Sequence, residues 1–129
     1  MLIDLLTLID FYERKGVTVF VVSPLPIPKF QHASDYSRLL KFNRMSEKQY
    51  IEKSKIKFED FVSQFGDINK ELEGRLGDRY IKAYENLCDE MSCYFGDLGG
   101  SYFSDTNHIS KYGLSVVADS FDFVEFNTK

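Results

Sequence analysis

The first apolar residues of the chain recur every three or four positions. This spacing places them on one face of a helix. Lys15 and the following Gly16 are typical of the last turn and C-terminal cap of a helix. We therefore expect a helix that ends shortly before Gly16. Its apolar face would consist of Leu2, Leu5, Leu6, Ile9 and Tyr12.

The run VTVFVV, residues 17–22, follows at once and does not alternate between apolar and polar positions. Such a run is typical of a strand that is covered on both faces in a parallel sheet. The next segment, SPLPIP, has proline at positions 24, 26 and 28. Proline can neither donate to a strand ladder nor continue a helix. We therefore expect a buried strand with an extended loop at its carboxyl end.

The middle of the chain predicts two more helices and a strand. Ser46 and Gln49 have the spacing of a capping box, which would open a helix that runs to about Phe65. A short helix near residues 69–76 and a strand near residues 80–83 follow.

Ser110 is placed to cap a last helix, because serine is a preferred residue at helix N-termini. The alternation of helices with a buried strand is typical of an α/β layered domain. A chain of 129 residues fits one such domain, so we interpret residues 1–129 as a single unit. The apolar face of the last helix would consist of Leu114, Val117, Ala118 and Phe121.

The composition is that of a folded protein, with 43% hydrophobic and 28% charged residues. A net charge of −4 makes nucleic acid a poor partner, because binding a run of phosphates requires a basic surface. The apolar run at the start carries Asp4 and Asp10 and is too short to span a bilayer. It also lacks the basic region and cleavage site of a signal peptide. We therefore expect neither an export signal nor a transmembrane segment in this chain.

One segment, SYFSDTNHISKYG at residues 101–113, suggests catalysis. It sets Asp105 three residues before His108, one of two histidines in the chain. In open parallel sheets, ligands bind beyond the carboxyl ends of the strands, and the loop before the last helix can open onto that edge. The carboxylate would then hold one ring nitrogen while the other acts as a general base on a hydroxyl. The alternative is an aspartate that caps a turn beside an exposed histidine.

A longer segment, LCDEMSCYFGDLGGSYFSDTNHISKYG, resembles the last block of the SGNH hydrolase-like domains of bacterial membrane O-acyltransferases of the acyltransferase-3 family. The upstream GVTVFVVSPLPIP is similar to the strand and proline loop of these domains. The resemblance implies an SGNH-hydrolase (flavodoxin-like) three-layer fold with a parallel sheet, of which the N-terminal strands are missing. It depends on the joint occurrence of Cys88, Cys93, Asp105, His108, Ser110 and Gly113.

By this resemblance, His108 is the general base that activates a serine, and Asp105 orients it. The serine of the family lies in a G-D-S block early in the domain, followed by glycine and G-x-N-D blocks that form the oxyanion hole. The Gly-Asp pairs of this chain, at positions 66, 77 and 96, are not followed by serine, and no G-x-N-D occurs. We therefore expect residues 1–129 to be the C-terminal portion of a single SGNH hydrolase-like domain.

Two other residues are candidates for the site. Ser23 stands at the tip of the predicted strand, but it precedes proline and has no G-x-S-x-G elbow, so we interpret it as a loop residue. His32 follows the proline loop and could reach the edge of a site or a substrate. A surface loop histidine is the favoured interpretation of His32.

Cys88 and Cys93 enclose four residues. A structural zinc site would require two more ligands at matching spacing, and the histidines are badly placed to supply them. The resemblance implies a disulfide instead, because the family domain faces the periplasm, where such bonds persist. Two unpaired thiols are the alternative. We expect no metal and no cofactor.

The resemblance implies transfer of an acyl group, in particular acetyl, to hydroxyls of a cell-surface polysaccharide or of peptidoglycan. The partners would be an acyl donor, a carbohydrate acceptor and an integral-membrane acyltransferase domain upstream, with the chain in the periplasm or otherwise outside the cytoplasm. A catalytically inactive remnant or interaction domain is the main alternative, and a small flavodoxin-like binding domain is a third. An open sheet edge would favour self-association.

Overall fold

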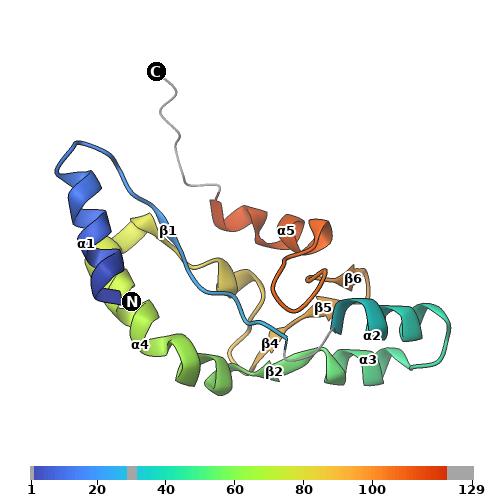
Figure 1. Ribbon diagram of the computed structural model, residues 1–129. Coiled ribbons are helices and arrows are strands. Elements are labelled where there is room, and N and C mark those ends of the chain that lie inside the picture. Colours follow the sequence, from blue (N-terminus) through green and yellow to red (C-terminus); the bar gives the residue numbers. More distant parts are fainter. Residues whose placement is uncertain (1, 29–31, 122–129) are drawn as a thin grey trace.

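The computed structural model describes residues 2–28 and 32–121 and contains both helices and short strands (Figure 1). The helices are α1 (Leu2–Glu13), α2 (His32–Lys41), α3 (Glu47–Lys53), α4 (Phe58–Leu76) and α5 (Lys111–Val117). The strands are β1 (Val21–Val22), β2 (Lys55–Lys57), β3 (Tyr80–Ile81), β4 (Ser92–Tyr94), β5 (Gly96–Asp97) and β6 (Gly100–Ser101). Short 3₁₀ helices span Gly77–Arg79, Ala83–Asn86 and Ala118–Phe121.

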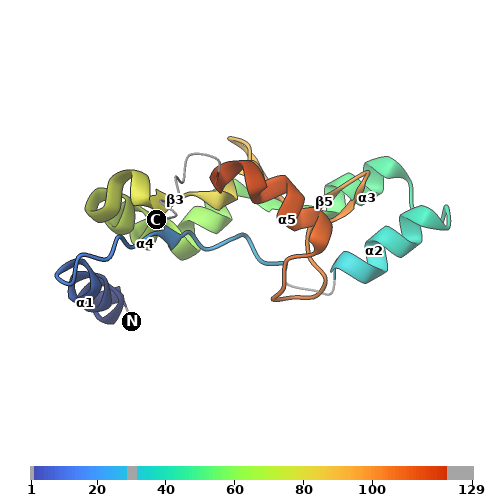
Figure 2. The same ribbon diagram turned by 90° about the horizontal axis from the view of Figure 1, so that it is seen from above.

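The elements spread along one long direction in both views. Helices α1 and α4 lie toward one end, α2 and α3 lie at the other, and α5 lies over the middle (Figures 1 and 2). Within the described residues, β1 pairs with β3 in parallel, whereas β2 with β4 and β5 with β6 are antiparallel. This mixture with a small parallel sheet is compatible with the predicted α/β class. The three-layer arrangement with missing strands stays a prediction.

The strand predicted over residues 17–22 is regular in its last two residues, which form β1. The prediction that this strand is covered on both faces is wrong. Val17, Phe20 and Val22 are 48%, 39% and 47% exposed. The residue types of this run are those that buried parallel strands contain. In this structure, however, the neighbouring elements cover only some of its side chains. The following SPLPIP segment forms neither helix nor strand, which agrees with the predicted loop.

Helix α1 packs against α4 through apolar side chains, and Gly16 follows it with a φ of 79°, as a helix cap requires. Ile9 of α1 is 1% exposed in this contact. The buried members of the cluster are Ile9, Leu72, Leu76 and Tyr80, and Leu2, Leu5, Leu6, Val19, Val21 and Ile68 pack against them. The predicted apolar face of α1 therefore enters this core, except for Tyr12, which is 43% exposed.

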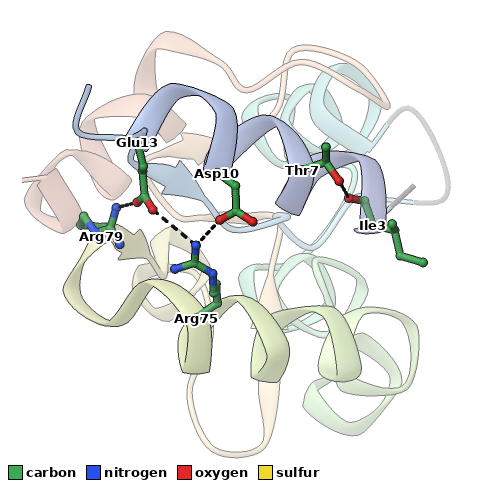
Figure 3. A network of polar contacts seen from close by, with 6 residues as sticks. All are labelled: Ile3, Thr7, Asp10, Glu13, Arg75 and Arg79. Atoms are coloured by element: carbon green, nitrogen blue, oxygen red, sulfur yellow. Dashed lines mark hydrogen bonds and ion pairs between the residues drawn. The ribbon is translucent and has the colours of Figure 1, made fainter. Parts of the chain in front are cut away.

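Charged side chains join α1 to the end of α4 beside this core (Figure 3). Arg75 points between Asp10 and Glu13, with its Nη2 3.4 Å from Oε2 of Glu13 and in closer contact with Asp10. Arg79 contacts the other oxygen of Glu13. These groups are partly exposed to water, so the pairs contribute little to the free energy of unfolding.

The helix predicted from Ser46 to about Phe65 is two helices. Its start is confirmed, because Ser46 and Gln49 form the capping box of α3. The prediction of its end is wrong, since Lys55–Lys57 forms β2 and pairs with β4. Helix α4 then runs without a break through the residues predicted as a separate short helix. The partner strand β4 lies about forty residues away in sequence, so the local pattern does not reveal this break.

A second core lies beneath α5. Leu25 of the proline segment packs against it, which places that segment next to the residues that precede the Asp105 loop. The segment closed by the Cys88–Cys93 disulfide and the residues just before the Asp105 loop also contribute to this core. Its buried members are Ala83, Leu87, Phe95, Tyr102, Phe103 and Val117.

Ser110 caps α5 as predicted, because its Oγ accepts the amide of Gly113 at 2.9 Å. The predicted apolar face is partly wrong. Gly113 and Val117 are the buried residues of α5, whereas Leu114 is 55% exposed and Ala118, in the following 3₁₀ helix, is exposed too. The face is turned because Gly113 lies against the backbone of Tyr102, and a Cβ at Gly113 would be 2.0 Å from the Tyr102 carbonyl oxygen.

We expect Gly113→Ala to lower the free energy of unfolding by about 1–3 kcal/mol, because the new methyl group overlaps the backbone. Denaturant unfolding measures this change. Gly74→Ala in α4 is the matched control, since nothing lies within 4 Å of its added Cβ. That variant should gain stability, up to about 1 kcal/mol, from helix propensity. Equal stability changes in the two variants would contradict the close packing of α5.

Candidate functional site

The segment with Asp105 and His108 is a short closed loop before α5. Phe103 and Ile109 form an isolated antiparallel bridge at its base. The amide of Ser104 donates to the carbonyl of His108 at 2.8 Å inside this bridge. Phe103 is buried in the core beneath α5. The loop is therefore held at both ends while its tip faces solvent.

The structure brings Asp105 and His108 together. Nδ1 of His108 lies 2.9 Å from Oδ1 and 2.8 Å from Oδ2 of Asp105. Oδ1 also accepts the backbone amides of Asn107 at 2.7 Å and His108 at 2.8 Å. The aspartate thus caps the turn and contacts the imidazole at the same time. This geometry is compatible with both interpretations of the sequence pattern.

The hydrogen bonds lower the pKa of Asp105. The largest cause is the amide of Asn107, followed by the His108 side chain and the His108 amide. An ionised carboxylate accepts hydrogen bonds, so it favours the tautomer that carries the proton on Nδ1. Nε2 then has a free lone pair. The His108 side chain is 75% exposed, which leaves this nitrogen open to an approaching hydroxyl.

Ser23 is not joined to this pair. Its amide donates to the carbonyl of Ile81 at 2.9 Å, which extends the pairing of β1 with β3. The side chain is buried, and its Oγ has no hydrogen-bond partner in the described part of the chain. Ser23 follows β1 outside any helix or strand, which agrees with its interpretation as a loop residue. His32 is the first residue of α2, but its side chain lies outside what the structure describes.

Cys88 and Cys93 form a disulfide with a Cα–Cα distance of 4.0 Å. Inside the loop that it closes, Asp89 accepts the amides of Met91 at 2.8 Å and Ser92 at 2.7 Å. These hydrogen bonds, the one from Met91 first, lower the pKa of Asp89. Cys93 is fully buried, and Cys88 packs against the core beneath α5, so the disulfide attaches this loop to that core.

Sequence reasoning missed a cluster around Asp97. Its Oδ2 accepts the hydroxyl of Tyr102 at 3.0 Å, and its Oδ1 accepts the hydroxyl of Tyr112 at 2.8 Å and the amide of Gly99 at 2.7 Å. Tyr102 and Tyr112 lie on the two sides of the Asp105 loop in sequence. The only signal in the sequence was that both tyrosines flank the D-x-x-H segment.

Among residues 2–28 and 32–121, no group of three or more histidine, cysteine, aspartate or glutamate side chains is placed to hold a metal ion. The helices in those ranges include none with the length and apolar character needed to cross a bilayer. A surface cavity of about 460 Å³ lies elsewhere, near the end of α4, and does not include the Asp105 loop. It is lined by Glu73, Gly77, Asp78, Tyr80, Lys82, Glu85, Asn86, Asp119 and Ser120.

Comparison with known proteins gives one match. The family model of the SGNH domain, described as fused to AT3 domains, matches residues 3–123. The match includes the proline segment, both cysteines and the Asp105 loop. No curated protein and no solved structure matches the chain significantly.

We expect His108→Ala to raise the pKa of Asp105 while leaving it below the ordinary aspartate value. The imidazole contributes to lowering this pKa, but the amide of Asn107, which contributes most, remains in the variant. A carboxyl ¹³C NMR titration measures the change. Since folding lowers this pKa, the ionised carboxylate stabilises the loop above the unfolded-state pKa. This contribution is lost as pH falls through the folded-state value.

Asp89 is the matched control for that titration, because backbone amides lower its pKa without a histidine. His108→Ala should leave the pKa of Asp89 unchanged. An unchanged pKa at Asp105 in the same variant would show that the imidazole contact is not maintained in solution.

We expect reduction of the disulfide to lower the free energy of unfolding by about 2 kcal/mol, the chain-entropy value for a short loop. Urea unfolding with and without reductant measures this, and a Cys88→Ser, Cys93→Ser double variant should not respond to reductant. Mass spectrometry should show a gain of two hydrogen atoms on reduction and no bound metal. Stoichiometric zinc in the native protein would contradict the disulfide.

Proposed function

Because the chain belongs to the family of SGNH domains that are found fused to AT3 domains, we propose that it is the Asp-x-x-His part of an acyltransferase or esterase. The family implies hydrolase-like or acyltransferase-like chemistry. In this proposal His108 is the general base and Asp105 is its orienting carboxylate. The observation that carries it is the contact of both Asp105 oxygens with Nδ1 of an otherwise exposed imidazole.

The proposed reaction has two steps. Nε2 of His108 takes the proton of a serine hydroxyl while the serine oxygen bonds to the acyl carbonyl carbon. The tetrahedral intermediate collapses, the donor leaves with the proton from the imidazolium, and an acyl-serine ester remains. In the second step Nε2 deprotonates an acceptor hydroxyl, which attacks the ester carbonyl, and the imidazolium returns this proton to the departing serine oxygen. Asp105 stabilises the imidazolium in both steps.

The serine in this proposal comes from outside the 129 residues. The pairs Gly66-Asp67, Gly77-Asp78 and Gly96-Asp97 are not followed by serine. Ser23 is buried at the end of β1, and its Oγ makes no hydrogen bond to the described residues. We propose that a G-D-S block and the oxyanion-hole blocks complete the domain. In that arrangement residues 1–129 are the C-terminal portion of one SGNH domain.

The proposed acceptor is a hydroxyl of a cell-surface polysaccharide or of peptidoglycan, and the proposed acyl group is acetyl. The fusion of such domains to AT3 domains supports a membrane acyltransferase domain as the source of the acyl group. The Cys88–Cys93 disulfide supports a site of action outside the cytoplasm, because disulfides persist in oxidising compartments.

A catalytically inactive remnant or interaction domain is the second candidate. The lack of a G-D-S block in these residues favours it. In that case the Asp105–His108 contact would serve only to close the loop before α5.

We expect the isolated chain to hydrolyse p-nitrophenyl acetate no faster than stray nucleophiles do, because a base without a serine has no covalent route. Joined to a segment that carries the serine and oxyanion-hole blocks, it should turn the ester over. In that protein His108→Ala should remove most of the rate. Asp105→Asn should lower kcat by about 10³–10⁴-fold, because an amide does not hold the required tautomer.

His32→Ala is the control, since it removes the one other histidine. It should leave the rate unchanged. The double variant of Asp105 and His108 should lose little more than His108→Ala alone, because the two residues act as a unit. Turnover by the isolated chain that survives His108→Ala would overturn the proposed site. An inactive joined protein with the Asp105–His108 contact intact would favour the inactive remnant.

A further inference from the structure

We propose that Asp97, through the hydroxyls of Tyr102 and Tyr112, is a positioning residue that holds the Asp105 loop in the geometry its histidine requires. This proposal deepens the proposed function, because the loop carries the proposed base. None of the three residues touches the reacting atoms. Each acts on His108 through the backbone that carries it.

Asp97 is itself rigidly placed. It ends β5, and its Cα pairs with that of Gly100 across the tight hairpin to β6. The carboxylate folds back over the turn and accepts the amide of Gly99 at 2.7 Å. Gly100 has a φ of 150°, which few residues other than glycine adopt. The hairpin therefore presents the carboxylate in one orientation.

The two tyrosines bracket the loop. Tyr102 precedes the Phe103–Ile109 bridge and donates to Oδ2 at 3.0 Å, whereas Tyr112 lies in the first turn of α5 and reaches both carboxylate oxygens, at 2.8 and 2.9 Å. Hydrogen bonds to an ionised carboxylate are roughly twice as strong as neutral ones. One carboxylate thus ties together the residue before the loop and the helix after it.

Both phenols stay protonated and remain donors at neutral pH. Burial is the first cause that raises the pKa of Tyr102, and the hydrogen bond to Asp97 is the next. The hydrogen bond from Tyr112 to Asp97 is the first cause that raises the pKa of Tyr112. The aromatic rings lie 5.9 Å apart, so they also support each other.

Backbone contacts connect the two tyrosines to the Asp105 loop. The carbonyl of Tyr102 accepts the amide of Ser110 at 2.8 Å, and Gly113 packs against the same carbonyl. Asp105 and His108 are 45% and 75% exposed, and an exposed ion pair contributes little by itself. Their geometry therefore depends on a backbone that is fixed at both ends.

The test uses Tyr112→Phe, which removes one hydroxyl and keeps the ring. Tyr94→Phe is the matched control, because its hydroxyl donates to Asp89 at 2.9 Å in the disulfide loop, away from the Asp105 loop. Two NMR measurements on the 129-residue chain report the pair directly. They are the pKa of Asp105 from carboxyl ¹³C shifts and the His108 tautomer from two-bond ¹H–¹⁵N correlations.

We expect Tyr112→Phe to raise the pKa of Asp105 and to convert His108 from the Nδ1-protonated tautomer to a mixture. Tyr94→Phe should leave both readouts at their wild-type values, although each variant loses one tyrosine–aspartate hydrogen bond. In the joined, active protein, Tyr112→Phe should lower kcat about tenfold with little change in KM, the effect of losing one charged hydrogen bond.

If the Tyr112→Phe variant folds and keeps the wild-type pKa of Asp105 and the wild-type tautomer of His108, the proposal is overturned. Asp97 would then be a merely structural residue. Asp97→Asn repeats the test should Tyr112→Phe fail to fold. The NMR readouts involve no substrate. Tyr112→Phe could change the pKa of Asp105 and the tautomer of His108 while His108→Ala leaves the rate of the joined protein unchanged. That result would overturn the proposed function and support the positioning role.

Discussion

The contact between the first turn of α5 and the backbone of Tyr102 is the constraint on which the candidate site depends. A side chain at position 113 would overlap the Tyr102 carbonyl, so only glycine lets the helix approach so closely. The same approach lets Ser110 cap the helix and bond to Ser101 at 2.7 Å. It also sets the two ends of the loop that contains Asp105 and His108.

Solvent exposure determines what the Asp105–His108 pair contributes. Because both side chains are largely exposed, their contact adds little to the free energy of unfolding. The backbone amide of Asn107 contributes more than the imidazole to lowering the pKa of Asp105. The loop therefore keeps its carboxylate ionised by its own conformation. The imidazole contacts this carboxylate and stays accessible from outside.

The predictions of the fold that succeeded concern interactions within a few residues. The caps at Ser46 and Ser110 and the end of the first helix at Gly16 follow from hydrogen bonds and dihedral angles that nearby residues determine. The predictions that failed depend on distant parts of the chain. The helix predicted to run to about Phe65 is interrupted by β2, which pairs with the distant β4. Val22 and Leu114 are exposed because burial depends on which distant element covers a residue.

The candidate site also combines contacts between nearby residues with contacts between distant residues. The sequence by itself determined that Asp105 stands three positions before His108 in a turn that the aspartate caps, which is the local condition for their contact. Only the tertiary structure decided that Asp97 meets Tyr112, fifteen residues away. That contact requires the β5–β6 hairpin and α5 to pack on the same core. No local pattern encodes it, since its free energy comes from surfaces that meet only after folding.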